Sequence, residues 1–200
     1  MSSSYRLELN KWLNNLDVQA DRVLDIGGSQ ERVKDRVKSW DVKEYLIADL
    51  PNPHKDSPEP DIEMNMNVEF IVNFDCDANN QILEQVEGKF DLIFCLEVYD
   101  YVYDTMAAFG NLYHLLAEDG TAWVTFPSVY PLHQPVEDDA LRYMPGAIRK
   151  LAKASGLTVE EMIPRRPETN GWQQFYSAER MRAAKHEDHA FTGWICRFSK

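Results

Sequence analysis

The chain has few cysteines and no long apolar segment. Three cysteines in 200 residues, none in a C-x-x-C pair, are too few for a disulfide framework, a zinc knuckle or a redox dithiol. No apolar run approaches the roughly 18 residues that a membrane span needs. The opening MSSSYRLELNKWL lacks the basic head and apolar run of a signal peptide. We therefore expect a soluble, cytoplasmic protein with no membrane span.

Basic residues are also scarce. Lys and Arg number 21 against 33 Asp and Glu, which gives a net charge of −12 at pH 7. A surface this acidic repels phosphate backbones and anionic lipid, so we expect no nucleic-acid partner. The five histidines are scattered and form no metal-ligand pattern, so we expect no metal. The oligomeric state stays open.

Apolar residues make up 44% of the chain, enough to build the core of one ordinary domain. Apolar periodicity predicts helices and strands that alternate along the chain. The predicted helices lie around 9–16, from near Ser29 to Trp40, at 106–116 with Gly120 as a cap, at 145–155 and at 177–186. The predicted strands lie at 22–26, 44–49, 69–77, 90–98, 121–126, 157–163 and 193–199. Prolines make 51–60 a loop. Such alternation is typical of α/β proteins with a mostly parallel sheet and helices on both faces.

In such sheets, ligands bind at the carboxyl ends of the strands, and four predicted strands carry an acid there. The first strand ends in a glycine pair that lets a ligand approach the backbone, and an acid after the second strand suits a ribose diol. Read singly, each feature also fits a tight turn, a solvated strand end or an Asx-type turn. Together they predict a nucleoside site made of Asp25, Gly27, Gly28, Ser29, Asp49, Leu50, Asp75, Asp77, Ala78, Leu96 and Glu97.

A dinucleotide site fits less well. Its fingerprint G-x-G-x-x-G is absent, because the string after the first strand is G-G-S-Q-E-R. Asp25 also stands two residues before the first glycine, where it would repel a pyrophosphate. This acidic edge favours a nucleoside that carries positive charge.

These motifs resemble those of the class I S-adenosylmethionine-dependent methyltransferases. VLDIGGS is similar to their first motif, EYLIADL to the second, DCDAN to the third and KFDLIFCLEVYDYV to the fourth. The resemblance continues through LYHLLAEDGTAWVTFP and KASGLTVEEMI. It implies a Rossmann-like, seven-stranded sheet with an antiparallel last strand, and S-adenosylmethionine as cofactor. Asp49 would then meet the ribose. Asp75 or Asp77 would meet the adenine, and similarity to the family favours Asp77 with Ala78.

A narrower similarity lies in YPLHQPVEDDALRYMPGAIRKLAKASGL, which resembles a segment of the type-11 methyltransferases, including members linked to cell-surface saccharide synthesis. His133, between Pro131 and Pro135, is the candidate base, because its ordinary pKa suits proton removal from a hydroxyl at neutral pH. Asp139 and Arg142 are spaced to pair on a helix. Aromatic and basic side chains near the expected mouth are candidates for substrate binding: Tyr99, Tyr101, Tyr130, Arg142 and Tyr143.

The resemblance implies one methyltransferase domain over 1–200, with an N-terminal helix in 1–19, a cofactor-binding core in 20–163 and a C-terminal helix and strand in 164–200. The expected reaction is methyl transfer to oxygen or nitrogen of a small molecule or saccharide. The first motif departs from the family's D-x-G-x-G-x-G, since Ser29 and Glu31 stand at its later glycine positions. That departure keeps open a non-catalytic module that binds a nucleoside or a protein partner.

Overall fold

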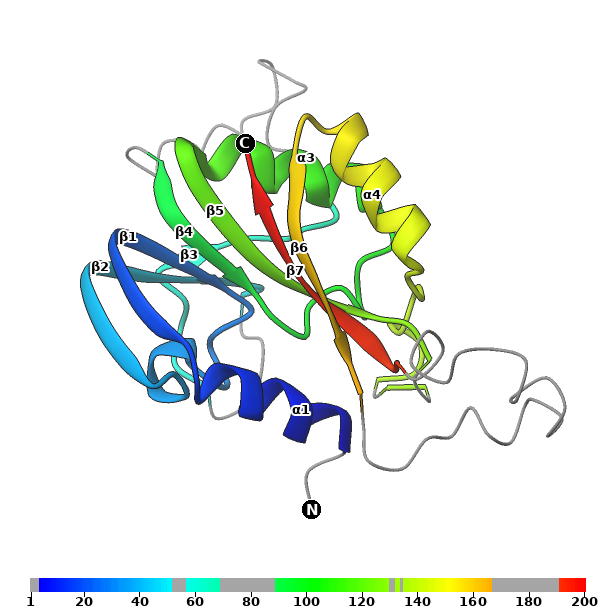
Figure 1. Cartoon of the computed structure of the whole chain (residues 1–200), viewed down its shortest axis with the longest axis horizontal. Coiled ribbons are helices and arrows are strands. Elements are labelled where there is room, and N and C mark those ends of the chain that lie inside the picture. The colour runs from blue at the N-terminus through cyan, green and yellow to red at the C-terminus, as the bar shows by residue number, and fades with distance from the viewer. Residues whose placement is uncertain (1–3, 52–56, 69–88, 130–131, 134, 167–190) are drawn as a thin grey trace, which may run out of the picture.

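Seven strands form one twisted sheet in the order β3-β2-β1-β4-β5-β7-β6 (Figure 1). The computed structural model describes residues 4–51, 57–68, 89–129, 132–133, 135–166 and 191–200. The first five strands pair in parallel, and β7 runs antiparallel to both β5 and β6. The α/β prediction, with a mostly parallel seven-stranded sheet and an antiparallel last strand, is confirmed. The strands are β1 (Asp17–Ile26), β2 (Ser39–Asp49), β3 (Ile62–Glu63), β4 (Phe90–Cys95), β5 (Leu116–Pro127), β6 (Thr158–Arg165) and β7 (Gly193–Ser199).

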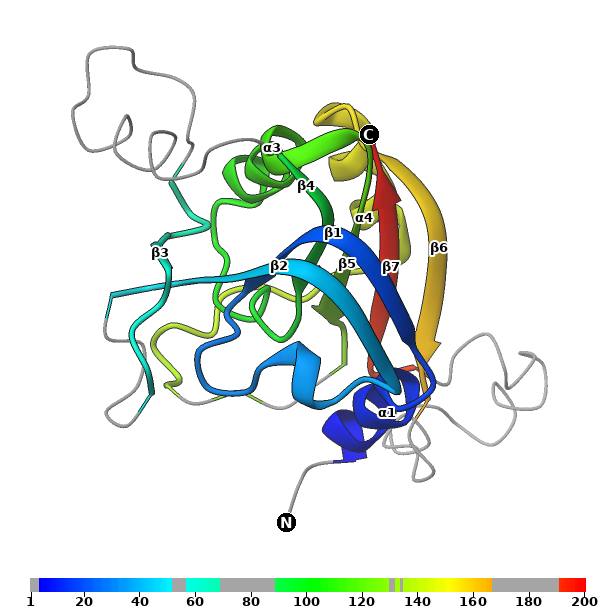
Figure 2. The same cartoon turned by 90° about the vertical axis from the view of Figure 1, so that its left-hand side faces the viewer.

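Helices cover both faces of this sheet. Figures 1 and 2 place α3 (Thr105–Leu115) and α4 (Pro145–Ala154) above the sheet, and α1 (Ser4–Leu13) below it. Alternate residues of each strand point to opposite faces and so join two separate apolar clusters. In β4, Ile93 and Cys95 pack on the side of α3 and α4, whereas Phe94 packs on the side of α1. The core is thus two layers divided by the sheet.

The connection between β1 and β2 contains no α-helix. Residues 27–38 hold only the 3-10 turn η1 (Val33–Asp35), so the helix predicted from Ser29 to Trp40 is wrong. Trp40 and Val42 instead alternate with exposed Asp41 along β2. In so short a window, apolar residues spaced three or four apart do not separate a helix from a turn followed by a strand.

The third strand differs from the prediction. The sheet position beside β2 is taken by Ile62–Glu63, which pairs with Ala48 and Asp49. The segment predicted as the third strand, 69–77, lies outside the described residues, as does most of the helix predicted at 177–186.

The two helices above the sheet follow the predicted positions, with one difference at a boundary. Helix α4 begins at Pro145, and Gly156 follows its end with φ +83°. Helix α3 ends at Leu115, and Gly120 lies within β5 rather than at the helix cap. The β4–β5 register shifts between Phe90 and Leu92. A Cβ at Gly120 would lie 2.7 Å from the carbonyl oxygen of Phe90, so this irregularity needs a glycine.

Two buried cysteines flank the middle of β5. Cys95 and Cys196 both pair with Val124, from its two neighbouring strands, and both face the α3 and α4 layer. Burial raises the pKa of both thiols well above the ordinary value.

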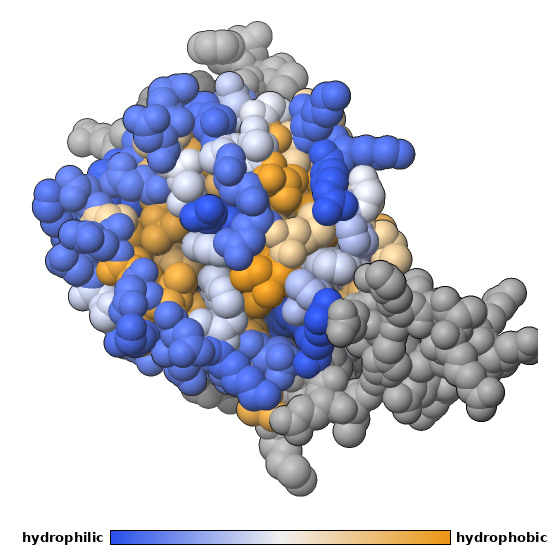
Figure 3. All heavy atoms as spheres, in the orientation of Figure 1, coloured by the Kyte–Doolittle hydropathy of each residue, from blue (hydrophilic) through white to orange (hydrophobic). Residues whose placement is uncertain are grey.

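Figure 3 shows hydrophilic side chains around the edge of the molecule and apolar ones between them. Among the described helices, none is long and apolar enough to cross a membrane.

Candidate functional site

The turn after β1 passes very close to its neighbours. Gly27 has φ +78°, and its N–H donates to the carbonyl of Ala48 at 2.7 Å. A Cβ on Gly27 would lie 2.4 Å from Cγ2 of Val98, and one on Gly28 would lie 2.4 Å from Oδ2 of Asp25. Neither position has room for a side chain, and the positive φ of Gly27 also favours glycine there.

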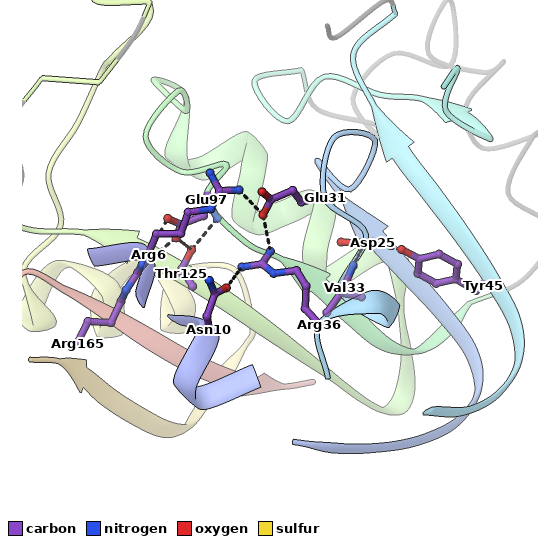
Figure 4. A network of polar contacts seen from close by, with 10 residues as sticks. All are labelled: Arg6, Asn10, Asp25, Glu31, Val33, Arg36, Tyr45, Glu97, Thr125 and Arg165. Carbon is purple, nitrogen blue, oxygen red and sulfur yellow. Dashed lines mark hydrogen bonds and ion pairs between the residues drawn. The ribbon is translucent and has the colours of Figure 1, made fainter. Parts of the chain in front are cut away.

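Asp25 holds this turn in place. Its Oδ2 accepts the N–H of Val33 at 2.8 Å and the hydroxyl of Tyr45 at 2.6 Å (Figure 4). The side chain is buried, and burial raises its pKa to about 6. Asp25 thus connects the turn to β2 and positions the backbone.

Asp49 faces the same turn from the end of β2. Its Oδ2 accepts the N–H of Ser29 at 3.2 Å, and its Oδ1 accepts the N–H of Leu50 at 2.9 Å. Asp49 is half-buried and Leu50 is exposed. Ser29 is buried, and its hydroxyl has no partner among the described residues. Ser29 and Asp49, predicted from two separate motifs, therefore meet at one place, and the Ser29 hydroxyl there has no partner among the described residues.

The residues that follow β3 lie next to Asp49. The N–H of Met64 donates to the carbonyl of Asp49 at 2.7 Å, and Asn65 comes next in the chain. The sequence analysis missed Asn65 because a longer apolar run further on was read as the third strand. Asp75, Asp77 and Ala78, predicted for this position, lie outside the described residues.

Glu97, two residues after β4, has a backbone conformation that side chains rarely adopt, with φ +61°. Its Oε1 accepts Nη1 of Arg165 at 2.6 Å and the hydroxyl of Thr125 at 3.0 Å, while its N–H donates to the Thr125 oxygen at 2.7 Å. The Arg165 side chain is fully buried. Leu96, just before Glu97, is buried in the cluster on the α1 side. No motif indicated Arg165, which comes from β6, far from Glu97 in the sequence.

A cavity of about 670 Å³ lies between α1 and the β1–β2 connection. Asn10 and Asn14 line it from α1, and Ser29 to Arg32, Asp35 and Arg36 line it from the connection. Arg6 and Arg36 both contact the carboxylate of Glu31 at this place (Figure 4). These charged residues were not predicted, because they come from segments that nothing in the sequence joins.

Two of the predicted substrate-binding tyrosines lie in the core instead. Tyr99 is completely buried, and its ring lies 4.5 Å from that of Phe126 and 5.7 Å from that of Tyr143. Tyr143 is also buried and donates its hydroxyl to the carbonyl of Val102 at 3.1 Å. The prediction that Tyr99 and Tyr143 line an acceptor pocket is therefore wrong, because these rings fill the layer above the sheet.

The other acceptor-side residues gather beyond β4. The Tyr101 hydroxyl hydrogen-bonds with Nδ1 of His133, and the His133 N–H donates to Oδ2 of Asp139 at 2.8 Å. Arg142 donates to both oxygens of Asp139, at 2.6 and 2.7 Å, and this lowers the pKa of that carboxyl. The pair forms in a loop rather than on the expected helix. Tyr130 lies outside the described residues.

Asp100 lies beneath this group. Its carboxyl is buried, its Oδ1 has no partner among the described residues, and burial next to Glu97 raises its pKa to about 6. His133, Arg142 and Arg165 favour its ionised form. No group of three or more metal-ligating side chains occurs in the described part of the chain.

Together, these features give an α/β protein with a candidate ligand site at the carboxyl edge of its parallel strands. The strand order reverses between β1 and β4, and the turn at Gly27 and the residues after β4, which include Glu97, flank that point. No α-helix begins after the glycine turn, so the site lacks the helix N-terminus that dinucleotide sites use for phosphate. This arrangement is typical of a nucleoside site.

Comparison with known proteins agrees on the fold. No protein-family model and no curated protein matches the sequence. An S-adenosylmethionine-dependent methyltransferase from Mesorhizobium loti matches with a TM-score of 0.58 at 11% identity, over 98% of each chain. The mitomycin 7-O-methyltransferase MmcR gives 0.57 at 12%, over 97% of this chain and 53% of its own. CalO1 of calicheamicin biosynthesis, solved with S-adenosylhomocysteine bound, gives 0.56 at 12%, over 98% and 54%.

This chain therefore spans about half the length of the two biosynthetic enzymes. It has the fold of the class I S-adenosylmethionine-dependent methyltransferases.

Proposed function

We propose that this protein is an S-adenosylmethionine-dependent methyltransferase that acts on a small-molecule acceptor. The observation that carries the proposal is the contact between Asp49 and the turn at Ser29, at the point where the strand order reverses. It brings a ribose-binding acid beside a close-packed glycine turn. MmcR, a neighbour in fold, is a small-molecule O-methyltransferase.

The residues present fit this cofactor. Asp49 would accept hydroxyls of the ribose, and the buried Ser29 hydroxyl has a donor and an acceptor to offer. Gly27 and Gly28 carry no side chain, so the ligand can approach the backbone closely, and Asp25 fixes their turn. Leu96 and Glu97, directly after β4, would border the site. Asn65, which follows β3, is our candidate for the adenine contact, with Asp75, Asp77 and Ala78 as further candidates. The cofactor supplies a methyl group on sulfur, and the chain's part is to align the acceptor and exclude water.

On the acceptor side, His133, Tyr101 and Arg142 are our candidates, with His133 as base. The hydroxyl of Tyr101 keeps its proton at neutral pH, since burial raises its pKa to about 12. Its hydroxyl oxygen accepts Nδ1–H of His133 in our proposal, which fixes the ring and leaves the lone pair of Nε2 to act as base. A saccharide of the cell surface is the narrower acceptor we propose. We also propose one cytoplasmic domain, with the core in 20–163 and no nucleic-acid partner.

Calorimetry tests the cofactor. S-adenosylmethionine and S-adenosylhomocysteine should bind, and NAD should not. Asp49→Ala should weaken binding by about 1–3 kcal/mol, the range for lost hydrogen bonds to a charged group. Asp41→Ala is the matched control, because Asp41 is exposed at the other end of the same strand. Binding of NAD, or of none of these ligands, would refute the proposal.

Turnover on a panel of amine, hydroxyl and sugar acceptors tests the chemistry. His133→Ala should lower turnover about tenfold or more and leave cofactor affinity nearly unchanged. His114→Ala, on α3, is the control. Unchanged turnover in His133→Ala would remove that residue from the mechanism. Cofactor binding without turnover on any acceptor would instead favour the non-catalytic module.

A further inference from the structure

A carboxylate lies between two arginines at the edge of the cavity. Oε2 of Glu31 contacts Nη2 of Arg6, from α1, and lies 3.6 Å from Nη1 of Arg36, from the β1–β2 connection (Figure 4). Both guanidinium groups approach the same oxygen atom. In a chain with a net charge of −12, two arginines that converge on one point need an explanation.

Arg36 is fixed in position, yet it uses little of its donor capacity. Its side chain is 16% exposed, and Nη2 donates to Oδ1 of Asn10 at 2.9 Å. Within the described part of the chain, this is the only hydrogen bond that its guanidinium makes. A guanidinium carries five N–H donors in a planar fork that matches a carboxylate. Arg36 is therefore held ready for an anion that approaches from the cavity.

Glu31 is only a weak partner for the unused N–H donors of Arg36. Its side chain is 44% exposed, and its 3.6 Å separation from Arg36 exceeds hydrogen-bond length. Ion pairs this exposed contribute little to stability, so the carboxylate can swing into solvent at low cost. A ligand carboxylate would make the two-pronged contact with Arg36 that Glu31 does not make.

The cavity leads from this arginine pair toward the nucleoside site. Ser29 lines the cavity with its buried, unpartnered side chain, and its N–H bonds to Asp49. A ligand with its ribose at Asp49 therefore has the cavity beside it, with Arg36 along the wall. S-adenosylmethionine carries an amino-acid group beyond its ribose, and this group ends in a carboxylate.

We propose that Arg36, assisted by Arg6, binds the α-carboxylate of the cofactor, and that Glu31 is an internal counter-ion which the cofactor displaces. This inference rests on the proposed function. It deepens that function by assigning the amino-acid end of the ligand to residues that no sequence motif indicates.

Two ligands that differ in the amino-acid group separate this inference from the proposed function. S-adenosylhomocysteine carries the carboxylate, whereas 5′-methylthioadenosine shares the nucleoside and lacks the amino acid. Calorimetry on the full chain should show that Arg36→Met weakens S-adenosylhomocysteine about tenfold or more and changes 5′-methylthioadenosine by less than about twofold. Glu31→Gln should tighten S-adenosylhomocysteine, because the competing charge is gone, and leave 5′-methylthioadenosine unchanged. Lys34→Met, on the same turn, is the control and should match the wild type.

Equal weakening of both ligands by Arg36→Met would overturn the inference, and so would no weakening of either. Weaker binding of S-adenosylhomocysteine to Glu31→Gln would also overturn it, because Glu31 would then assist the ligand. If inorganic phosphate bound through Arg36 while S-adenosylhomocysteine did not depend on that residue, the site would be one for phosphate and the inference would fall. If the wild type bound neither nucleoside, the proposed function itself would fail. Arg6→Met gives the same readout, should Arg36→Met not fold.

Discussion

Asp25→Asn should stabilise the protein above neutral pH, although it removes a buried charge at the centre of the site. Both hydrogen bonds to this carboxylate end on one oxygen, Oδ2, which accepts from Val33 and Tyr45. An amide oxygen in the same position accepts both. The substitution therefore keeps the shape and contacts of the protonated carboxyl and removes its ability to ionise.

The magnitude follows from the pKa. Burial raises the pKa of Asp25 from 3.8 to about 6, against the partial effect of its two hydrogen bonds and of Arg36. Because the folded-state pKa is the higher one, the contribution of Asp25 to stability is complete below pH 3.8 and is lost as pH rises through about 6. At 1.36 kcal/mol per pKa unit, the loss is about 3 kcal/mol at neutral pH. Asp25→Asn should recover most of it.

Urea unfolding between about pH 4 and about pH 8 measures this effect. In the wild type, Asp25 and Asp100 should both lower stability with rising pH in this range, because burial raises both pKa values to about 6. In the Asp25→Asn variant, the decrease in stability due to Asp100 should remain, and the decrease due to residue 25 should be absent. Asp21→Asn, an exposed acid on the same strand, is the control. A variant that is less stable than the wild type at pH 8, or that keeps the full pH dependence, would refute this reasoning.

Three further substitutions test other contacts. Gly27→Ala should destabilise the fold by about 1–3 kcal/mol in urea unfolding, because φ is +78° and the new methyl would meet Val98; Gly110→Ala, with nothing within 4 Å of its Cβ, should not destabilise it. Tyr45→Phe removes the donor to Asp25 and should cost about 1–2 kcal/mol at neutral pH and less at low pH, so a loss independent of pH would contradict this account. Tyr101→Phe should shift the pH–rate profile of methyl transfer through its contact with His133, whereas Tyr103→Phe, at a ring that is 70% exposed, should leave the profile unchanged.

Most of the sheet could be predicted because most of its strands contain apolar runs, and some of these runs end at a glycine, a proline or an acid. Residues 193–199 form β7 as expected, and the glycine turn after Ile26 marks the end of β1. The third strand could not be predicted. A two-residue edge strand such as Ile62–Glu63 has almost no apolar pattern of its own, and its position is set by pairing with Ala48 and Asp49.

Residues of the candidate site could be predicted from the sequence only where a residue type at a strand end has a single expected role. Asp49 and Gly27 are of this kind. Tyr99 is not, because a tyrosine after a strand fits a pocket wall and a core equally well, and the rings around it decide. The pairs Glu97–Arg165 and Arg36–Glu31 were missed in different ways. Arg165 is 68 residues from its partner, and Arg36 depends on Asn10 of α1 for its orientation.

The placement of Cys95 and Cys196 on either side of Val124 makes the two thiols natural reporters of motion in the centre of the sheet. A thiol reacts with an alkylating reagent as its thiolate, and these two are both covered and held in the neutral form. Alkylation must therefore wait until β5 separates from a neighbouring strand or the layer of α3 and α4 lifts away. With Cys76 replaced by serine, the alkylation rate of the native protein would measure how often this central region opens, and cofactor that binds at the strand ends would slow that rate in proportion to its occupancy.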